Sequence, residues 1–324
     1  MSDTINGQPV SWQPIDDWEE RAKQIAGKLR RRREGLRFVG VAGDYAQADV
    51  YPGSVLQLVA FVHAEEPEYT LGALEAIDHT PVRVDWLNDG YLFEQARVFA
   101  DEITAHRLAT LRPLLTLDQV VRDVLIALRD DYFSPAERRR RIERLLEGAL
   151  ERLDAYEASQ EGAVVAEAFI WGVGPALCHL VDEPPSTTRL MARFSGAARV
   201  RRMPEASVAV RETLALDDRD PSVVLDQARR LAGLAVEGEL NGEQLDGLVV
   251  RGERAVRALN EAGDGVGAAF AALETAARID RAAAQAQPDF RAGAAYRELA
   301  QSIYGRPDVQ PLRHVIYEIK SANR

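Results

Sequence analysis

The chain has 324 residues, of which 46% are hydrophobic and 28% are charged, a composition that excludes a disordered protein and predicts about two globular domains. Its formal net charge of −11 argues against general nucleic-acid binding, because no basic surplus is present to neutralise phosphates. A single cysteine, a polar N-terminus and the lack of an apolar run of about 18 residues predict a cytoplasmic protein without a disulfide, signal peptide or membrane span.

The first third of the chain predicts a helix followed by a small mixed β-sheet. Apolar residues at helical spacing indicate a helix over residues 16–34. Two apolar runs, 36–42 and 54–62, are typical of strands, and the second is apolar enough to be buried on both faces. We expect residues 71–77 to form a short helix or turn, and residues 82–87 to form a later strand of the same sheet.

After residue 91 the strand patterns largely stop, and the chain predicts helices to its end. A helix over 91–110 is followed by a domain boundary, so we expect a sheet domain of residues 1–112 and a helical domain of residues 113–324. Thr116, with Gln119 three residues later, has the pattern of a capping box that opens the next helix. The predicted fold class is therefore α+β, with an all-α bundle after the sheet.

Further helices are expected throughout the second part of the chain. Ser134 precedes Pro135 and predicts a helix start. A more apolar helix over 161–180 is expected to kink near Gly174 and Pro175. The remaining predicted helices cover 222–236, 242–262, 266–286, 290–303 and 308–321.

Residues that bear on function lie on the predicted strands. Gly43 closes the first strand, Ser54 opens the second, and Asp85 lies on a later strand. This order resembles the nucleotidyltransferase superfamily, in particular the aminoglycoside (kanamycin) nucleotidyltransferase domain with its helical C-terminal domain. In that family the first strand ends in Gly-Ser, the second opens with Ser-Asp-x-Asp, and a later strand supplies a third carboxylate. The resemblance covers about the first third of the chain.

Three positions depart from the family pattern. Asp44 stands where the family has serine, and Val55 and Gln57 stand where it has the two aspartates. The resemblance implies magnesium held between carboxylates and a nucleoside triphosphate, and magnesium prefers hard oxygen ligands. Val55 has no ligand atom, an amide is a poor substitute for a carboxylate, and an ionised Asp44 would repel phosphate. All three changes oppose binding of a metal–triphosphate complex.

Three functional interpretations follow. The first is a nucleotidyltransferase-like pseudoenzyme with no cofactor, in which Gly43, Asp44, Ser54 and Gln57 line a nucleotide-type site, and a pocket between sheet and helices binds a small molecule or a partner. The second is an active transferase for a small hydroxyl or amine acceptor, with magnesium held by Asp44, Asp49 and Asp85. In the third, the helical region is an oligomerisation or partner-binding surface.

Asp85 has two interpretations of its own. As the carboxylate retained from the family pattern it is the candidate catalytic and metal-binding residue. As an isolated carboxylate it would instead pair with an arginine near Arg83 or from the helical region. Alternation places Gln57 on one face of its strand with Val59, and Asp85 on one face of its own strand with Arg83. If the family geometry holds, the resemblance implies that Gln57 and Asp85 point at the same pocket.

Overall fold

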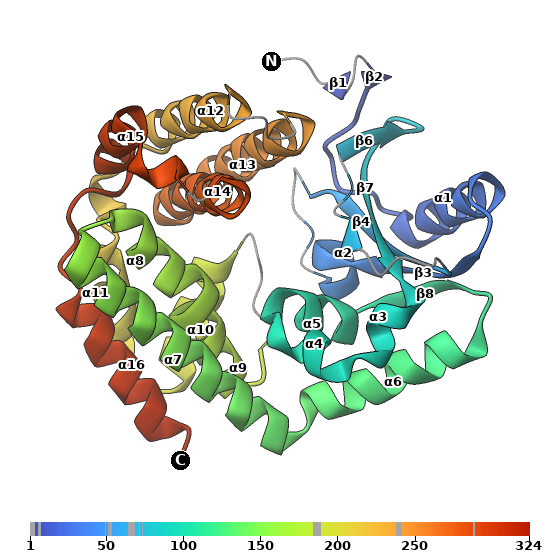
Figure 1. Cartoon of the computed structure of the whole chain (residues 1–324), viewed down its shortest axis with the longest axis horizontal. Helices are drawn as coiled ribbons and strands as arrows, with labels where there is room; N and C mark the ends of the chain where they lie inside the picture. Colours follow the sequence, from blue (N-terminus) through green and yellow to red (C-terminus); the bar gives the residue numbers. More distant parts are fainter. Residues whose placement is uncertain are drawn as a thin grey trace. The chain divides into compact units, whose positions relative to one another are not determined.

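The computed structural model describes residues 4–5, 8–48, 50, 54–63, 69–70, 72, 74–183, 189–237, 242–287 and 289–324. The chain divides into two compact units, Met1–Glu137 and Arg138–Arg324. A mixed sheet with flanking helices makes up the first unit, and helices make up the described part of the second (Figure 1). The predicted α+β fold class, with the helical part following the sheet, is confirmed.

The first unit is built around a six-stranded sheet. Its strand order is β5-β7-β4-β3-β8, with β6 also paired to β7. β4 and β7 are parallel, and every other pair in this sheet is antiparallel, so the sheet is mixed. The strands are β3 (Leu36–Ala42), β4 (Leu56–Val62), β5 (Tyr69–Thr70), β6 (Leu74–Ile77), β7 (Thr80–Asn88) and β8 (Arg112–Thr116). A separate pair, β1 (Thr4–Ile5) and β2 (Gln8–Pro9), precedes them.

Both faces of the sheet are covered, which explains why β4 is apolar at nearly every position. Leu56, Leu58 and Ala60 belong to one core, together with the buried side of α1 (Trp18–Arg32). Val59 and Phe61 point to the other face and belong to a second core. This alternation follows from the two-residue period of a strand. The predicted burial of this strand on both faces is confirmed.

Helices from the following segment form the second core. They are α3 (Asp89–Phe93), α4 (Gln95–Ala100), α5 (Glu102–Ala109) and α6 (Gln119–Phe133). Leu92, Leu108, Val121 and Leu125 from these helices are buried together with Phe38 of β3. The edge-to-face contact of Phe38 with Phe61, at 5.9 Å between ring centres, links β3 and β4 on this face.

Several local predictions for the first unit were wrong. Within 71–77, residues Leu74–Ile77 form strand β6 rather than a helix, and this strand joins β7 through a two-residue turn. The single helix expected over 91–110 is three short helices. Thr116 is the last residue of β8, and the cap of α6 is Asp118, whose side chain accepts a 2.9 Å hydrogen bond from the backbone N–H of Val120.

The division between the units also differs from the predicted boundary at residue 112. Residue 112 lies at the start of β8, which pairs with β3, for example through Leu115 opposite Val39. The helix after β8, α6, buries its apolar side in the second core of the sheet. The first compact unit therefore extends through Glu137, into the first turn of the next helix.

The second unit contains the predicted succession of helices. Its elements are α7 (Pro135–Ser159), α8 (Gly162–Ala168), η1 (Phe169–Val173), α9 (Gly174–Leu180), α10 (Leu190–Val200), α11 (Pro204–Thr213), η2 (Leu216–Asp218), α12 (Pro221–Glu237), α13 (Gly242–Glu261), α14 (Gly265–Ala286), η3 (Phe290–Ala292), α15 (Ala294–Tyr304) and α16 (Gln310–Ala322). The capping role of Ser134 is confirmed, since its Oγ accepts a 3.2 Å hydrogen bond from the backbone N–H of Glu137.

The apolar run Gly162–Leu180 has a π-helical segment instead of a simple proline kink. The five π-helical residues, Phe169–Val173, come immediately before Gly174 and Pro175. The expectation that no apolar run reaches about 18 residues was wrong, because by length and composition this run could cross a membrane; 94% of its most apolar window is, however, buried inside the structure. Phe169 contacts Phe194 and Phe270 edge to face, with ring centres 5.1 and 5.5 Å away. The run therefore has the surroundings of a core helix.

Candidate functional site

Gln57 and Asp85 meet in the middle of the sheet of the first unit. β4 and β7 run parallel in a register that places Val59 opposite Asp85 and Gln57 opposite Arg83. The Gln57 side chain reaches along the sheet, and its Nε2 donates a 2.8 Å hydrogen bond to Oδ2 of Asp85. The two residues that were expected to point to the same place therefore lie in direct contact.

Asp85 is fully buried and is surrounded by donors. Its Oδ2 also accepts hydrogen bonds from the guanidinium groups of Arg83, at 3.0 Å, and Arg107 of α5, at 2.8 Å. Its Oδ1 accepts from the backbone N–H of Gly72 at 3.1 Å. Burial favours the neutral acid, but the two arginines and the Gln57 hydrogen bond outweigh it and hold the pKa of Asp85 below its ordinary value. We refer to Asp85, Gln57, Arg83 and Arg107 as the Asp85 cluster.

Gly43 lies against the same glutamine. It has a φ of +67°, which strains any residue with a side chain, and a Cβ built on it would lie 2.9 Å from Oε1 of Gln57. Gly43 begins the short helix α2 (Gly43–Gln47) directly after β3. Glycine is therefore required here both by the backbone conformation and by the close approach of Gln57.

Asp44 and Ser54 form a second contact. Ser54 is buried, and its Oγ donates a 2.9 Å hydrogen bond to Oδ2 of Asp44. Val55, the neighbour of Ser54, supplies no ligand atom. The structure thus brings the predicted residues together as two pairs, Asp44 with Ser54 and Gln57 with Asp85.

The donors around Asp85 do not fit a magnesium site. Oδ2 is shared by three hydrogen-bond donors, two of which are cationic guanidiniums, so a divalent cation there would meet like charge. In the part of the chain that the structure describes, no group of three or more His, Cys, Asp or Glu side chains could hold a metal ion. Asp49, the third member of the rearranged metal set, lies outside the described residues.

Arg107 and the backbone of Gly72 are the partners of Asp85 that sequence reasoning did not identify. The sequence did favour an arginine partner as one of the two alternatives for Asp85, and Arg83 was visible two positions before it on the same strand. Arg107 is 22 residues away on a helix, and nothing local distinguishes it from the other arginines. Only the packing of α5 in the first unit selects it.

A polar cavity of about 460 Å³ lies elsewhere in the first unit. Its wall includes Gln13 and Asp16 from the segment before α1, Arg21 of α1, and Asp78 and His79 of the β6–β7 turn. Both turn residues have positive φ, 50° and 63°. The turn is fixed in place because Arg21 donates a 2.8 Å hydrogen bond to the Asp78 carbonyl oxygen, and Ser11 N–H donates to that of His79 at 2.8 Å. None of the residues of the Asp85 cluster lines this cavity.

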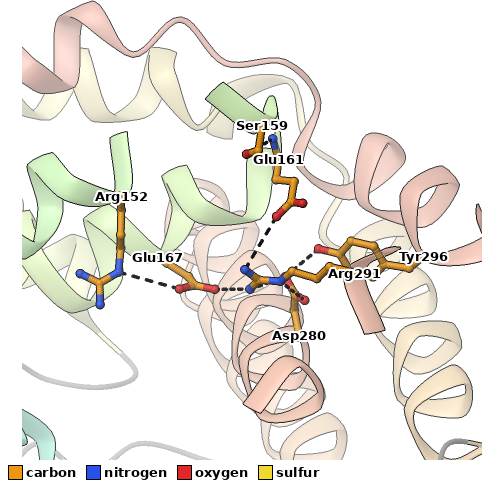
Figure 2. Close-up of polar contacts among 7 residues, drawn as sticks. All are labelled: Arg152, Ser159, Glu161, Glu167, Asp280, Arg291 and Tyr296. Carbon is orange, nitrogen blue, oxygen red and sulfur yellow. Dashed lines mark hydrogen bonds and ion pairs between the residues drawn. The ribbon is translucent and has the colours of Figure 1, made fainter. Parts of the chain in front are cut away.

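The second unit contains a larger buried group of charges, centred on Arg291 (Figure 2). Arg291 lies on η3, a short 3-10 helix in the connection between α14 and α15, and its guanidinium contacts Asp280 of α14 and Glu167 of α8. Glu161 lies 3.9 Å from it. The hydroxyl of Tyr296 on α15 donates a 3.1 Å hydrogen bond to Asp280. We refer to these five residues as the Arg291 cluster; no local pattern in the sequence indicates it.

No protein-family model matches the chain, and no curated protein matches it. Among solved structures, the chain is similar to a nucleotidyltransferase-like protein from Exiguobacterium sibiricum, at 14% identity over 94% of this chain and 88% of the other. The TM-score of that superposition is 0.30, so we infer neither fold nor function from it.

Proposed function

We propose that this chain is a nucleotidyltransferase-like protein that has lost metal-dependent nucleotidyl transfer and retains a binding function, for a small molecule or a partner. The observation that carries this proposal is the environment of Asp85. Where the resemblance implies a metal between three carboxylates, one carboxylate remains, and its Oδ2 is occupied by Arg83, Arg107 and Gln57.

The charge balance supports the loss of catalysis. Two guanidiniums face one carboxylate in the Asp85 cluster, and their side chains are only 17% and 14% exposed. To admit magnesium, Asp85 would have to exchange these donors for the metal, which would bring a dication against two largely buried guanidiniums. The arginines therefore serve as permanent counter-ions of Asp85, in place of a metal.

A binding function is supported by the polar cavity beside Arg21 and His79. Its volume of about 460 Å³ lies in the range of small-molecule sites. This cavity does not depend on Asp85, so binding there would persist without any metal chemistry.

Isothermal titration of the full chain with ATP, GTP, CTP and UTP, with and without magnesium, tests the loss of catalysis. We expect no magnesium-dependent heat and no release of pyrophosphate when small hydroxyl or amine acceptors are added. The variant Asp85→Asn serves as the matched control. Magnesium-dependent binding that disappears in this variant would contradict the proposal and favour an active transferase with Asp44, Asp49 and Asp85 as metal ligands.

The binding function has a separate test. The chain is screened by thermal shift against a library of polar metabolites, and each hit is repeated with Arg21→Ala and His79→Ala. We expect hits whose stabilisation is lost in these variants and kept in Asp85→Asn. If no compound binds, a pull-down with the full chain distinguishes a protein partner from a chain without a binding function.

A further inference from the structure

Asp280 is the most deeply buried member of the Arg291 cluster. Its side chain is fully inaccessible to solvent, whereas the side chains of Glu167 and Arg291 are 11% and 20% exposed. Oδ1 of Asp280 accepts a hydrogen bond from Nε of Arg291 at 3.1 Å, and Oδ2 accepts from Tyr296 at 3.1 Å. Among the residues that the structure describes, the hydrogen bonds to this carboxylate come from Arg291 and Tyr296.

Negative charge exceeds positive charge around Asp280. Arg291 is shared among Asp280, Glu167 and Glu161, so one guanidinium faces three carboxylates (Figure 2). Arg152 of α7 adds a second cation, but it lies 3.8 Å from Glu167, on the outer side of the cluster. Buried like charges are costly, and a cluster with this imbalance lowers its energy by taking up a proton.

Tyr304 adds a further unfavourable feature. It is buried, and within the part of the chain that the structure describes its hydroxyl has no hydrogen-bond partner. Burial, followed by the nearby Asp280, raises the pKa of Tyr304 well above its ordinary value. The groups around Asp280 are thus Glu167 from α8, Arg291 from η3, and Tyr296 and Tyr304 from α15. Asp280 is the least solvated carboxylate of the cluster.

We propose that the Arg291 cluster is a proton-sensitive latch, in which uptake of a proton by Asp280 tightens the attachment of the α14–α15 turn to α8. Once Asp280 is neutral, Glu167 and Glu161 are the remaining carboxylates beside the guanidiniums of Arg291 and Arg152, and Arg291 no longer divides its charge with a third carboxylate. The Tyr296 hydroxyl can still donate to Asp280. With Asp280 ionised, the excess negative charge favours opening of the turn, which lets water reach the carboxylate.

The direction in which pH changes this opening follows from proton linkage. Burial raises the pKa of Asp280 from 3.8 to about 6, against the lowering effect of Arg291. A raised carboxyl pKa means that the closed form binds the proton more tightly, so closure is strongest in acid and weakens as pH rises towards the raised pKa. If Asp280 has its ordinary pKa in the open form, the opening constant rises about tenfold between pH 5 and pH 7.

Hydrogen exchange of the full chain at pH 5 and pH 7 measures this opening. The variant Asp280→Asn is run in parallel, because an amide cannot titrate and the intrinsic exchange rates nearly cancel in the ratio. We expect the ratio of wild-type to variant exchange in α8 and the α14–α15 turn to rise about tenfold from pH 5 to pH 7. Peptides from β4 serve as an internal control whose ratio stays constant. A constant ratio in the second unit would overturn the proposal.

A second variant tests the latch if Asp280→Asn does not fold. Tyr296→Phe removes the donor that favours ionised Asp280, and therefore moves the midpoint of the exchange step to higher pH. A midpoint that stays where it is in wild type, or moves to lower pH, would show that Asp280 is not the titrating group and would overturn the proposal.

Discussion

Gln57 donates a 2.8 Å hydrogen bond to Asp85 across two parallel strands, so a neutral amide lies beside the carboxylate at a position where the resemblance places a second carboxylate. This contact is compatible with two arginine partners for Asp85, because an amide adds a donor and no negative charge. An aspartate at position 57 would instead compete for the same guanidiniums. The Asp85 cluster is therefore internally consistent as an ion pair with its own supporting hydrogen bonds.

Removal of Arg107 should destabilise the first unit. Arg107→Ala leaves buried Asp85 with one cation fewer, and breaking a buried pair costs roughly 3 kcal/mol or more. Urea unfolding measures the loss, and hydrogen exchange in β4 and β7 assigns it to the first unit. The matched control is Arg97→Ala, which removes an exposed ion pair with Glu94 and should change stability by less than about 1 kcal/mol. Equal effects of the two variants would contradict the structural role of Arg107.

Protonation of Asp85 at low pH should lower the free energy of unfolding of the first unit. Because the folded pKa of Asp85 lies below its ordinary value of 3.8, its contribution to stability is present above about pH 4 and is lost as pH falls through the folded pKa. Asp85→Asn should be less stable than wild type at pH 7 and should lack this acid-dependent loss. Unfolding of both proteins between pH 2.5 and pH 7, followed by exchange in β7, checks the prediction. Parallel pH profiles would rule it out.

The pH dependence expected for Asp85, in which stability is lost in acid, is opposite in sign to the one expected for Asp280. Asp85 accepts hydrogen bonds from four donors, two of which are arginines. Asp280 instead shares one arginine with two other carboxylates. Both are fully buried aspartates, so burial alone does not decide the direction of a pKa shift. The ratio of cations to carboxylates in each cluster decides it.

Sequence patterns predicted the central part of the first unit well. Strands β3, β4 and β7 were identified from their apolar runs, and the resemblance, on the condition that its geometry held, placed Gln57 and Asp85 at the same pocket. Strands β6 and β8 were missed because both lie beside a stronger central strand, and β8 is short and contains Pro113. Their conformation is set by pairing with β7 and β3, which no local pattern reports. The Arg291 cluster was missed for the same reason, since Arg291 and Glu167 are 124 positions apart.

A side chain at position 43 should disturb the contact between Gln57 and Asp85. Gly43→Ala introduces a methyl group 2.9 Å from Oε1 of Gln57 at a positive φ, with an expected cost of about 1–2 kcal/mol. Gly27→Ala is the matched control, because a Cβ at Gly27 in α1 meets nothing within 4 Å and alanine favours a helix by about 1 kcal/mol. The thermal unfolding temperature should therefore fall for Gly43→Ala and rise for Gly27→Ala. A stabilised Gly43→Ala would contradict the tight packing of α2 on β4.

The π-helical segment should be equally intolerant of added volume. A Cβ at Gly172 would lie 2.7 Å from Cβ of Ala149 and 2.9 Å from the Leu145 carbonyl oxygen on α7. We expect Gly172→Ala to destabilise the second unit by roughly 1–3 kcal/mol. Gly196→Ala in α10 meets nothing within 4 Å and should be neutral or stabilising. Urea unfolding with exchange in α8 and α9 tests both, and similar midpoints would mean that α7 and η1 are not in close contact.

The pairing of β3 with β8 has a consequence for synthesis of the protein. β3 contains residues 36–42, but its second partner is not complete until residue 116, and the β4–β7 pair must also form across intervening chain. Such distant pairings fold slowly, because a long loop has to close before any strand contact compensates for the lost chain entropy. During synthesis we therefore expect β3 to lack its β8 partner, and the sheet face covered by α6 to stay exposed, until both segments have emerged. This interval is when the nascent chain is most exposed to aggregation and to chaperone binding.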